Sequence, residues 1–282
     1  MNLLSINSHV ACGHVGNAAA VFALQRLGCE VWPVHTALFS NHPGHGSFRG
    51  EMVEASALRA LVRGIEQRGV LARCDGVLSG YLGQPETGEA ILEAAARVKA
   101  ANPAARYCCD PVIGDAGRGV YVRAGIPEFL RQRALPAADV LTPNQFELER
   151  LSGGATPTLA AVLAAVEALA ARGPRAILVT SLATAETPKD SIDLVACERA
   201  GRFRLRTPRL PVAVHGAGDA VAALFFLYWL RTGSAAEALS RAASAIFGVL
   251  HQTALAGADE MRLIDAQEEL VNPSRMFSAE PV

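Results

Sequence analysis

The sequence predicts an α/β fold, with a doubly wound, mostly parallel sheet flanked by helices in one domain over residues 1–282. Short β-like runs alternate with longer Ala/Leu/Arg-rich stretches along most of the chain. No Ser/Pro/Gly-rich linker interrupts this alternation. Hydrophobic residues make up 51% of the chain and charged residues 19%, which is enough apolar material for one large core.

The alternation can be followed in order from the N-terminus. The run "NLLSI" precedes a helical stretch at 14–27, "VWPVHTALF" precedes one at 54–68, and "GVLSG" precedes one at 86–101. The runs "YCC" and "ADVLT" follow, then helical stretches at 144–151 and 159–171, and then "AILVT". Parallel strands need such crossover helices, which cover both faces of the sheet.

The C-terminal third departs from this pattern. Two alternating runs in "IDLVACERAGRFRLR" flank residues 199–201 and predict a small antiparallel hairpin at one edge of the sheet. An apolar helix from Gly218, a second from 235 to about 253 and a third near the end complete the pattern. The tail from about Asn272 is expected to be disordered, and the apolar run at 220–230 is too short to cross a bilayer.

Charge and cysteine content narrow the class of partner. The 26 basic and 27 acidic residues nearly cancel, so nucleic acid and anionic membranes are not expected and a small-molecule partner is favoured. The six cysteines show no CxxC pair and no Cys/His metal spacing, which favours a reducing cytosol. The opening "MNLLSINSHV" has no basic region followed by an apolar stretch, so no secretory signal is expected.

In sheets of this type, ligands bind outside the carboxyl ends of the strands. The polar residues that follow the predicted strands are Asn7, Ser8, His9, Ser40, Asn41, His42, Ser79, Gly80, Tyr81, Asp110, Thr142, Asn144 and Thr180. This placement locates a site without naming its ligand.

The stretch "HGAGDA" contains the strongest local signal. Its glycines and the helix that begins at Gly218 could hold phosphate charge on backbone N–H groups, with Asp219 placed to take a proton from a hydroxyl. Alternatively, Asp219 caps the helix and the glycines make a tight turn, and the local sequence gives both readings similar weight. A dinucleotide fingerprint fails because Val221 stands where Gly or Ala is needed, and no Walker pattern is present.

Other motifs are ambiguous when taken singly. Asp110 in "CCDPVIGD" is either a turn residue or a contact to magnesium or phosphate oxygens. Glu147 stands three residues after Asn144, which by itself indicates a helix capping box. Ser8 and His9 could cap the first helix, and Tyr81 could be an ordinary buried aromatic residue.

Together and in order, seven stretches resemble pyridoxal kinases of the ribokinase-like superfamily, most closely the bacterial branch devoted to pyridoxal: "INSHVACGHVGN", "FSNHPGHG", "LSGYLG", "KAANP", "CDPVIGD", "LTPNQFELE" and "HGAGDA". The resemblance covers most of the chain. It implies transfer of the γ-phosphoryl group of MgATP to the 5-hydroxymethyl group of pyridoxal, giving pyridoxal 5′-phosphate in vitamin B6 salvage. It also implies Mg²⁺ as a cofactor and a homodimer, and leaves open a monovalent cation; the cysteine content indicates a cytoplasmic location.

The resemblance also implies residue roles. Ser8 would bond the polar edge of the pyridine ring and Tyr81 would lie beside the ring. Asp110 and Glu147 would serve the magnesium and phosphates, Thr142 and Thr180 would line the ATP site, Gly216, Ala217 and Gly218 would form the anion hole, and Asp219 would be the base.

Three motifs depart from the family pattern, at four positions. Pro43 and Gly44, in the substrate-binding set, stand where related sequences often read Thr-Gln. Thr180 stands where lysine is common, which removes a positive charge near the triphosphate, and Val120 stands at a lid position where some relatives have cysteine.

Two alternatives remain open. A hydroxymethylpyrimidine kinase of the same superfamily would keep Asp219 and the anion hole but would need different ring contacts. A non-catalytic vitamer-binding protein with the kinase fold would explain Pro43 and Thr180 as signs of decay, although it would not need Asp110 and Glu147. A nicotinamide oxidoreductase is disfavoured by the failed fingerprint.

Overall fold

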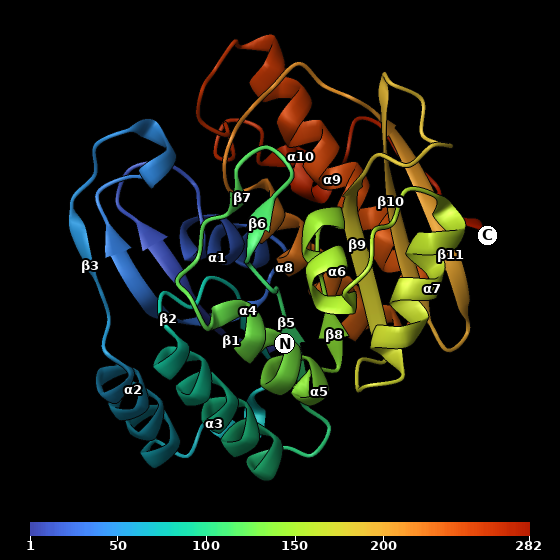
Figure 1. Ribbon diagram of the computed structural model, residues 1–282. Helices are drawn as coiled ribbons and strands as arrows, with labels where there is room; N and C mark the ends of the chain where they lie inside the picture. The colour runs from blue at the N-terminus through green and yellow to red at the C-terminus, as the bar shows by residue number, and fades with distance from the viewer.

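The computed structural model describes residues 1–282 and is built on a ten-stranded sheet of order β12-β11-β10-β9-β8-β5-β4-β1-β2-β3 (Figure 1). Its strands are β1 (Asn2–Val10), β2 (Glu30–Phe39), β3 (Gly50–Met52), β4 (Gly76–Ser79), β5 (Arg106–Cys109), β8 (Val140–Leu141), β9 (Ala176–Leu182), β10 (Ser191–Glu198), β11 (Gly201–Pro208) and β12 (Glu280–Pro281). The central strands from β2 through β9 pair in parallel, and antiparallel strands flank them on both sides. The predicted sheet type is confirmed.

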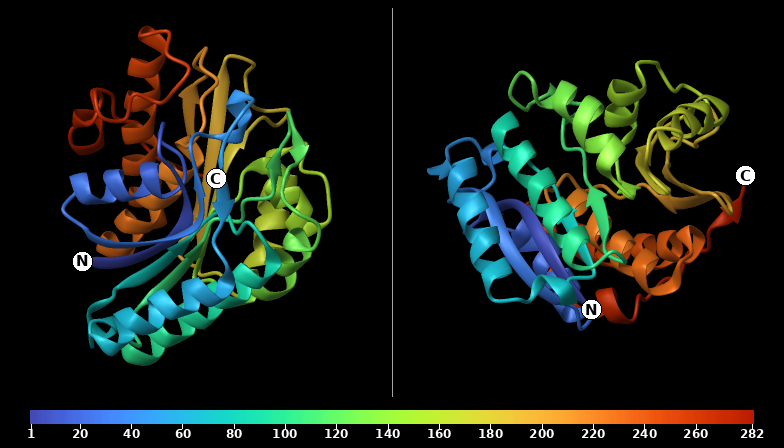
Figure 2. Two further views of the ribbon diagram at one scale, coloured as in Figure 1. Left: turned by 90° about the vertical axis from the view of Figure 1, so that its left-hand side faces the viewer. Right: turned by 90° about the horizontal axis from the view of Figure 1, so that it is seen from below.

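Helices cover both faces of the sheet (Figure 2). One layer contains α1 (Asn17–Arg26), α8 (Ala217–Thr232), α9 (Ala235–Leu255) and α10 (Glu268–Val271). The other contains α2 (Ala55–Gln67), α3 (Pro85–Ala101), α4 (Ile126–Phe129), the π-helical turn η3 (Leu130–Ala134), α5 (Leu135–Ala137), α6 (Gln145–Ser152) and α7 (Leu159–Ala170). The short turns η1 (Pro43–His45) and η2 (Leu71–Arg73) lie in loops.

Each strand supplies side chains to two separate cores, one under each helical layer. Leu3 belongs to the core beneath α1, α8 and α9, and its neighbour Leu4 belongs to the core beneath α2 and α3. Cys108 and Cys109 divide in the same way. Successive strand residues point to opposite faces, so a sheet covered on both sides requires continuous apolar runs such as those seen in the sequence.

The predicted antiparallel hairpin, β10–β11, lies at one end of the sheet, where the two-residue β12 pairs with β11. Other expectations are corrected by the structure. The tail is not disordered: the N–H of Phe277 donates to the Ser244 hydroxyl, and the Phe277 ring packs edge-on against Phe247. The structure also contains elements that the sequence did not predict: β3, and a separate two-stranded sheet of β6 (Gly114–Asp115) and β7 (Gly119–Val120).

Strand β9 contains a β-bulge that changes the direction of the side chains at its C-terminal end. Val179 and Leu182 of β9 face Val195 and Asp193 of β10, so β9 has one more residue in this interval than its partner. The extra length falls at 180–181, where Ser181 adopts a φ of 55°, in the left-handed region.

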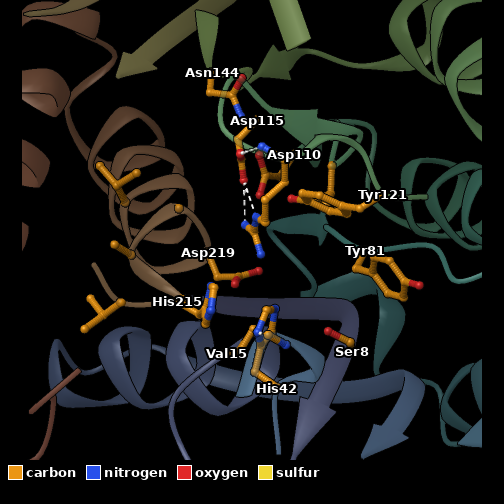
Figure 3. A pocket seen from close by; sticks show the side chains of 18 of the residues that line it. Ser8, Val15, His42, Tyr81, Asp110, Asp115, Tyr121, Asn144, His215 and Asp219 are labelled. Carbon is orange, nitrogen blue, oxygen red and sulfur yellow. Dashed lines mark hydrogen bonds and ion pairs between the residues drawn. The ribbon is translucent and has the colours of Figure 1, made fainter. Parts of the chain in front are cut away.

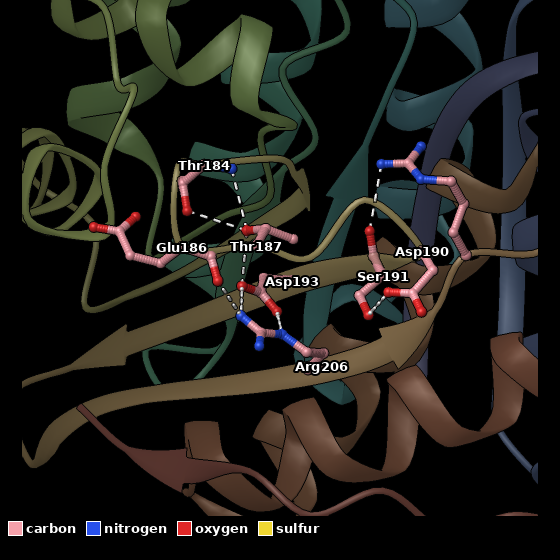
Figure 4. Close-up of polar contacts among 8 residues, drawn as sticks. Thr184, Glu186, Thr187, Asp190, Ser191, Asp193 and Arg206 are labelled. Atoms are coloured by element: carbon pink, nitrogen blue, oxygen red, sulfur yellow. Dashed lines mark hydrogen bonds and ion pairs between the residues drawn. The ribbon is translucent and has the colours of Figure 1, made fainter.

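The neighbouring loop at 183–190 is held by polar contacts (Figure 4). Asp193 accepts hydrogen bonds from Arg206 at 2.6 and 2.8 Å and from the Thr187 hydroxyl at 2.9 Å. Arg206 also donates to the carbonyl oxygen of Glu186 at 2.9 Å. The loop after the bulge is therefore tied to both strands of the hairpin.

None of the helices combines the length and apolar character that a membrane-spanning segment needs.

Candidate active site

A cavity of about 570 Å³ lies at the carboxyl ends of the central strands, beside the N-terminus of α8 (Figure 3). Every site residue predicted from the sequence lines it: Ser8, Pro43, Gly44, Tyr81, Asp110, Thr142, Glu147, Thr180, Gly216, Ala217, Gly218 and Asp219. The sequence motifs, spread over more than 200 positions, therefore converge on one site.

The glycine-rich turn before α8 leaves backbone donors free. Gly216 is the N-cap with a φ of 88°, and a Cβ at this position would clash with the carbonyl oxygen of His14. No protein acceptor lies within hydrogen-bonding distance of the N–H groups of Ala217 and Gly218. Because both residues line the cavity at a helix N-terminus, their amides can bind an anion there.

Asp219 is buried, and both of its carboxylate oxygens accept hydrogen bonds from outside α8. The side-chain amide of Asn7 donates to Oδ1 at 2.8 Å, and the N–H of Gly16 donates to Oδ2 at 2.9 Å. Burial raises the pKa of Asp219 above its ordinary value, while these two donors oppose the rise. The structure does not support the capping interpretation, because Gly216 is the N-cap and no side chain caps this helix.

Asn7 joins the two sides of the cavity. Its Oδ1 accepts the backbone N–H groups of Ser8 and Tyr81, each at 2.8 Å, while its amide holds Asp219. The sequence marked Asn7 only as a polar residue after a strand. Ser8 and His9 do not cap α1 as considered above, because β1 continues to Val10 and the α1 N-cap is Gly16.

Ser8 and Tyr81 lie on the same side of the cavity (Figure 3). The Ser8 hydroxyl has no hydrogen-bond partner within the protein, although the residue is only 7% exposed. The Tyr81 carbonyl oxygen accepts a hydrogen bond of 2.6 Å from the Thr36 hydroxyl, which fixes this part of the wall. The two residues can therefore present a hydroxyl group and an aromatic ring to a ligand.

Asp110 is a buried carboxylate with unused bonding capacity. Its Oδ1 accepts from the Thr142 hydroxyl at 3.0 Å, and Oδ2 has no protein partner. Burial, followed by the charges of Glu147 and Asp219, raises its pKa well above the ordinary value. A cation at this position would offset those like charges, so the donor chemistry of Asp110 fits a magnesium ion.

Glu147 serves first as a structural residue. It completes the predicted capping box with Asn144, and its second oxygen accepts the N–H groups of Ile113 at 2.9 Å and Gly114 at 3.4 Å. Burial raises its pKa to about 7. No group of three or more His, Cys, Asp or Glu side chains forms a metal site, so an ion here would need most of its ligands from phosphate and water.

The sequence gave no role to several residues that line the cavity. His42, marked only as a polar residue after a strand, and His215 stack with ring centroids 3.7 Å apart, and burial lowers the pKa of both, that of His42 to about 4. Arg118 is the only arginine or lysine that lines the cavity. Ser181 lines it beside Thr180 because the bulge breaks the alternation that would turn one of them away. The histidines next to the "HPGHG" and "HGAGDA" glycines were the one available signal.

A second cavity of about 180 Å³ adjoins the first. The two share Thr180, Ser181, Ala217, Gly218 and Val221. The remaining walls are mostly apolar side chains from β10, the end of β11 and the segment after it, and α9: Ile192, Leu194, Pro208, Leu210, Val212, Ala243, Ile246, Phe247 and Leu250. Such walls suit a flat, weakly polar ring.

A doubly wound sheet that places free helix N-terminal amides beside a buried aspartate has the arrangement expected of a kinase that phosphorylates a small molecule. Residues 16–262 match the family described as phosphomethylpyrimidine kinase. Pyridoxal kinase PdxY of Granulibacter bethesdensis is 55% identical to the chain over 99% of both, and that of Rubrobacter xylanophilus is 52% identical over 98% of this chain and 96% of its own.

The structure agrees with these relationships. It is similar to that of Leishmania donovani pyridoxal kinase in complex with ADP and pyridoxamine, with a TM-score of 0.92, 26% identity, and coverage of 100% of this chain and 99% of that one. The chain belongs to the pyridoxal kinase family, and its fold is the ribokinase-like fold that the sequence predicted.

Proposed function

We propose that the protein transfers the γ-phosphoryl group of ATP to the 5-hydroxymethyl group of pyridoxal. The observation that carries this proposal is the position of Asp219, which lies between the Ser8 and Tyr81 wall and the free amides of α8. An acceptor hydroxyl and a transferring phosphoryl group would meet at that junction. The close relatives are named pyridoxal kinases, and the similar Leishmania structure contains ADP and pyridoxamine.

Asp219 is proposed as the base. Its carboxylate would take the proton of the substrate hydroxyl as the oxygen attacks phosphorus, and its raised pKa makes it a stronger acceptor than an ordinary aspartate. The N–H groups of Ala217 and Gly218, with Gly216 shaping the turn, would bind the charge that develops on the phosphoryl oxygens.

The vitamer would occupy the Ser8 side of the cavity. The unpartnered Ser8 hydroxyl can bond the polar edge of the pyridine ring, and Tyr81 can pack beside the ring. Pro43 and Gly44 supply only backbone and apolar contact, because neither has a polar side chain, and a Cβ at Gly44 would clash with the rings of His42 and His215. Ring orientation would therefore depend mainly on Ser8.

The nucleotide would occupy the other half. Its phosphates would lie near Asp110, Thr142, Glu147 and Thr180, and its base would enter the second, apolar cavity beyond Ser181. Asp110 would hold Mg²⁺ with Glu147 acting through water, and the ion would neutralise phosphate charge.

We further propose one kinase domain over residues 1–282, a homodimer and a cytoplasmic location. The continuous sheet supports the first, and the family resemblance supports the second. Six free cysteines support a reducing compartment. A particle of twice the 29.6 kDa chain mass in sedimentation equilibrium would agree with the dimer.

The test is product formation by the purified protein with MgATP and pyridoxal, pyridoxine, pyridoxamine or hydroxymethylpyrimidine. We expect ADP and pyridoxal 5′-phosphate to form in equal amounts. The matched family description makes hydroxymethylpyrimidine kinase the second candidate, which turnover of the pyrimidine alone would favour. Vitamer binding without turnover of any compound would favour a non-catalytic binding protein.

A further inference from the structure

The cavity has an unfavourable charge balance for a nucleotide. Its lining contains four carboxylates, Asp110, Asp115, Glu147 and Asp219, against a single permanent cation, Arg118. The lining histidines add little, because burial lowers the pKa of His42 and of His215. Thr180, which also lines the cavity, carries no charge. A polyphosphate that enters this site therefore has one basic side chain available to it.

The backbone of Arg118 is well anchored. It belongs to the turn between β6 and β7, where Asp115 Oδ1 accepts the N–H groups of Gly117 at 3.0 Å and Arg118 at 2.8 Å. Asn144 donates to the carbonyl oxygen of Gly114 at 2.8 Å, which ties this small sheet to the start of α6. The turn is thus fixed to the same element that positions Glu147.

The guanidinium group of Arg118 has protein partners on one side only. It bonds Asp115 Oδ2 through Nε at 2.7 Å and through a terminal nitrogen at 2.6 Å, and it stacks over the Tyr121 ring at 4.8 Å. Its side chain is 46% exposed. Since a guanidinium has five N–H donors, several remain free for a ligand.

The positive charge of Arg118 affects titratable groups on the opposite side of the cavity. Asp115 and Asp110 lie on one side and His42 and His215 on the other, with Asp219 between them (Figure 3). The charge of Arg118 contributes to the lowered pKa of both histidines. His215 directly precedes the Gly216 turn, so the charge of Arg118 acts next to the region where the amides of α8 would bind phosphate.

We propose that Arg118 binds the nucleotide phosphates and supplies the positive charge that Thr180 does not, with Asp115 as the positioning residue that holds the guanidinium until the nucleotide arrives. This inference rests on the proposed function. Arginine suits phosphate binding at this position because its planar guanidinium can donate to two phosphate oxygens at once and can stack on the Tyr121 ring at the same time.

The test compares ADP with adenosine, by calorimetry without any vitamer. Arg118→Met should weaken ADP affinity by about tenfold to a hundredfold and leave adenosine affinity unchanged, since only ADP has phosphates. Arg118→Lys should recover part of the loss, because lysine keeps the charge without the fork. The matched control is Arg150→Met, which also removes an arginine that stacks on an aromatic ring, Phe146, but lies outside the cavity lining.

Asp115→Asn retains an acceptor for the turn amides and releases the guanidinium, so ADP affinity should hold or rise by a few fold. Unchanged ADP affinity in Arg118→Met would overturn the proposal. An equal loss of ADP affinity and adenosine affinity would also overturn it, as would a lower melting temperature in both Arg118 variants. If the parent binds ADP through Arg118 yet does not phosphorylate pyridoxal, the proposed function fails while this inference stands.

Discussion

Asn7 donates a hydrogen bond of 2.8 Å to Asp219, although the two residues are 212 positions apart in the chain. The same side chain accepts the N–H groups of Ser8 and Tyr81. One buried amide therefore sets the position of the proposed base relative to both proposed substrate contacts. Displacing it would alter the distance between the attacking oxygen and its proton acceptor, on which the transfer depends.

Asn7→Asp tests this connection. The substitution keeps an acceptor for Ser8 and Tyr81 but places a second carboxylate against Asp219. Like charges at that separation raise the pKa of one partner, so the acidic limb of the pH profile of kcat/KM should move up by about one unit or more. Profiles measured between about pH 5 and 9 would show the shift. Lower activity with an unmoved limb would contradict the role of Asn7 in holding the base.

Asp219→Asn should affect both catalysis and stability. We expect kcat to fall by roughly 10²–10⁴-fold, because the proton acceptor is lost. The free energy of unfolding should also fall by about 1–3 kcal/mol, because the new amide group faces the donor of either Asn7 or Gly16. Turnover, ADP affinity and urea unfolding on one preparation separate the effects. Activity within a few-fold of the parent would exclude Asp219 as the base.

The sequence revealed the parts of this molecule that depend on local pattern. Apolar periodicity located the main helices and central strands, and the "HGAGDA" motif located the glycine-rich turn before α8. The role of Asn7 could not be read, because it depends on a contact 212 positions away. The tail was misjudged for a similar reason, since Phe277 is ordered by α9 and not by its own neighbours.

A one-residue change of register is equally hard to see in a sequence. The β9 bulge turns Ser181 into the cavity beside Thr180, yet "AILVTSL" reads as an ordinary buried strand. Arg118 carries no motif of its own, and its position depends on how β6 and β7 pair. Local pattern thus predicted which segments line the site, while their exact mutual contacts required the fold.

Ser181 offers a test of the bulge. Ser181→Gly should raise the free energy of unfolding by about 0.5–1 kcal/mol, because glycine adopts a φ of 55° without steric cost. Ser181→Val should lower it by about 1–2 kcal/mol, because a β-branched residue is strained in this region. Urea unfolding midpoints would report both changes. A glycine variant less stable than the valine variant would mean that the left-handed conformation is absent.

Stability should depend on pH through the buried carboxyl groups of the cavity. Asp110, Glu147 and Asp219 all have raised pKa values, that of Glu147 about 7. A carboxyl with a raised folded-state pKa stabilises the fold below its unfolded pKa, and that contribution is lost as pH rises through the folded value. The protein without ligands should therefore melt at a lower temperature at about pH 8 than at about pH 5.

Magnesium with ADP should oppose this loss, because the cation neutralises the ionised carboxylates, so its stabilising effect should grow with pH. Asp110→Asn should flatten the pH dependence by removing one carboxyl and relieving Glu147 of a like charge. Asp259→Asn, at an exposed carboxyl outside the cavity, is the control. Melting curves from about pH 5 to 8 give the comparison. If the parent and Asp110→Asn lose stability equally as pH rises, the dependence arises elsewhere and the carboxyl cluster is not its source.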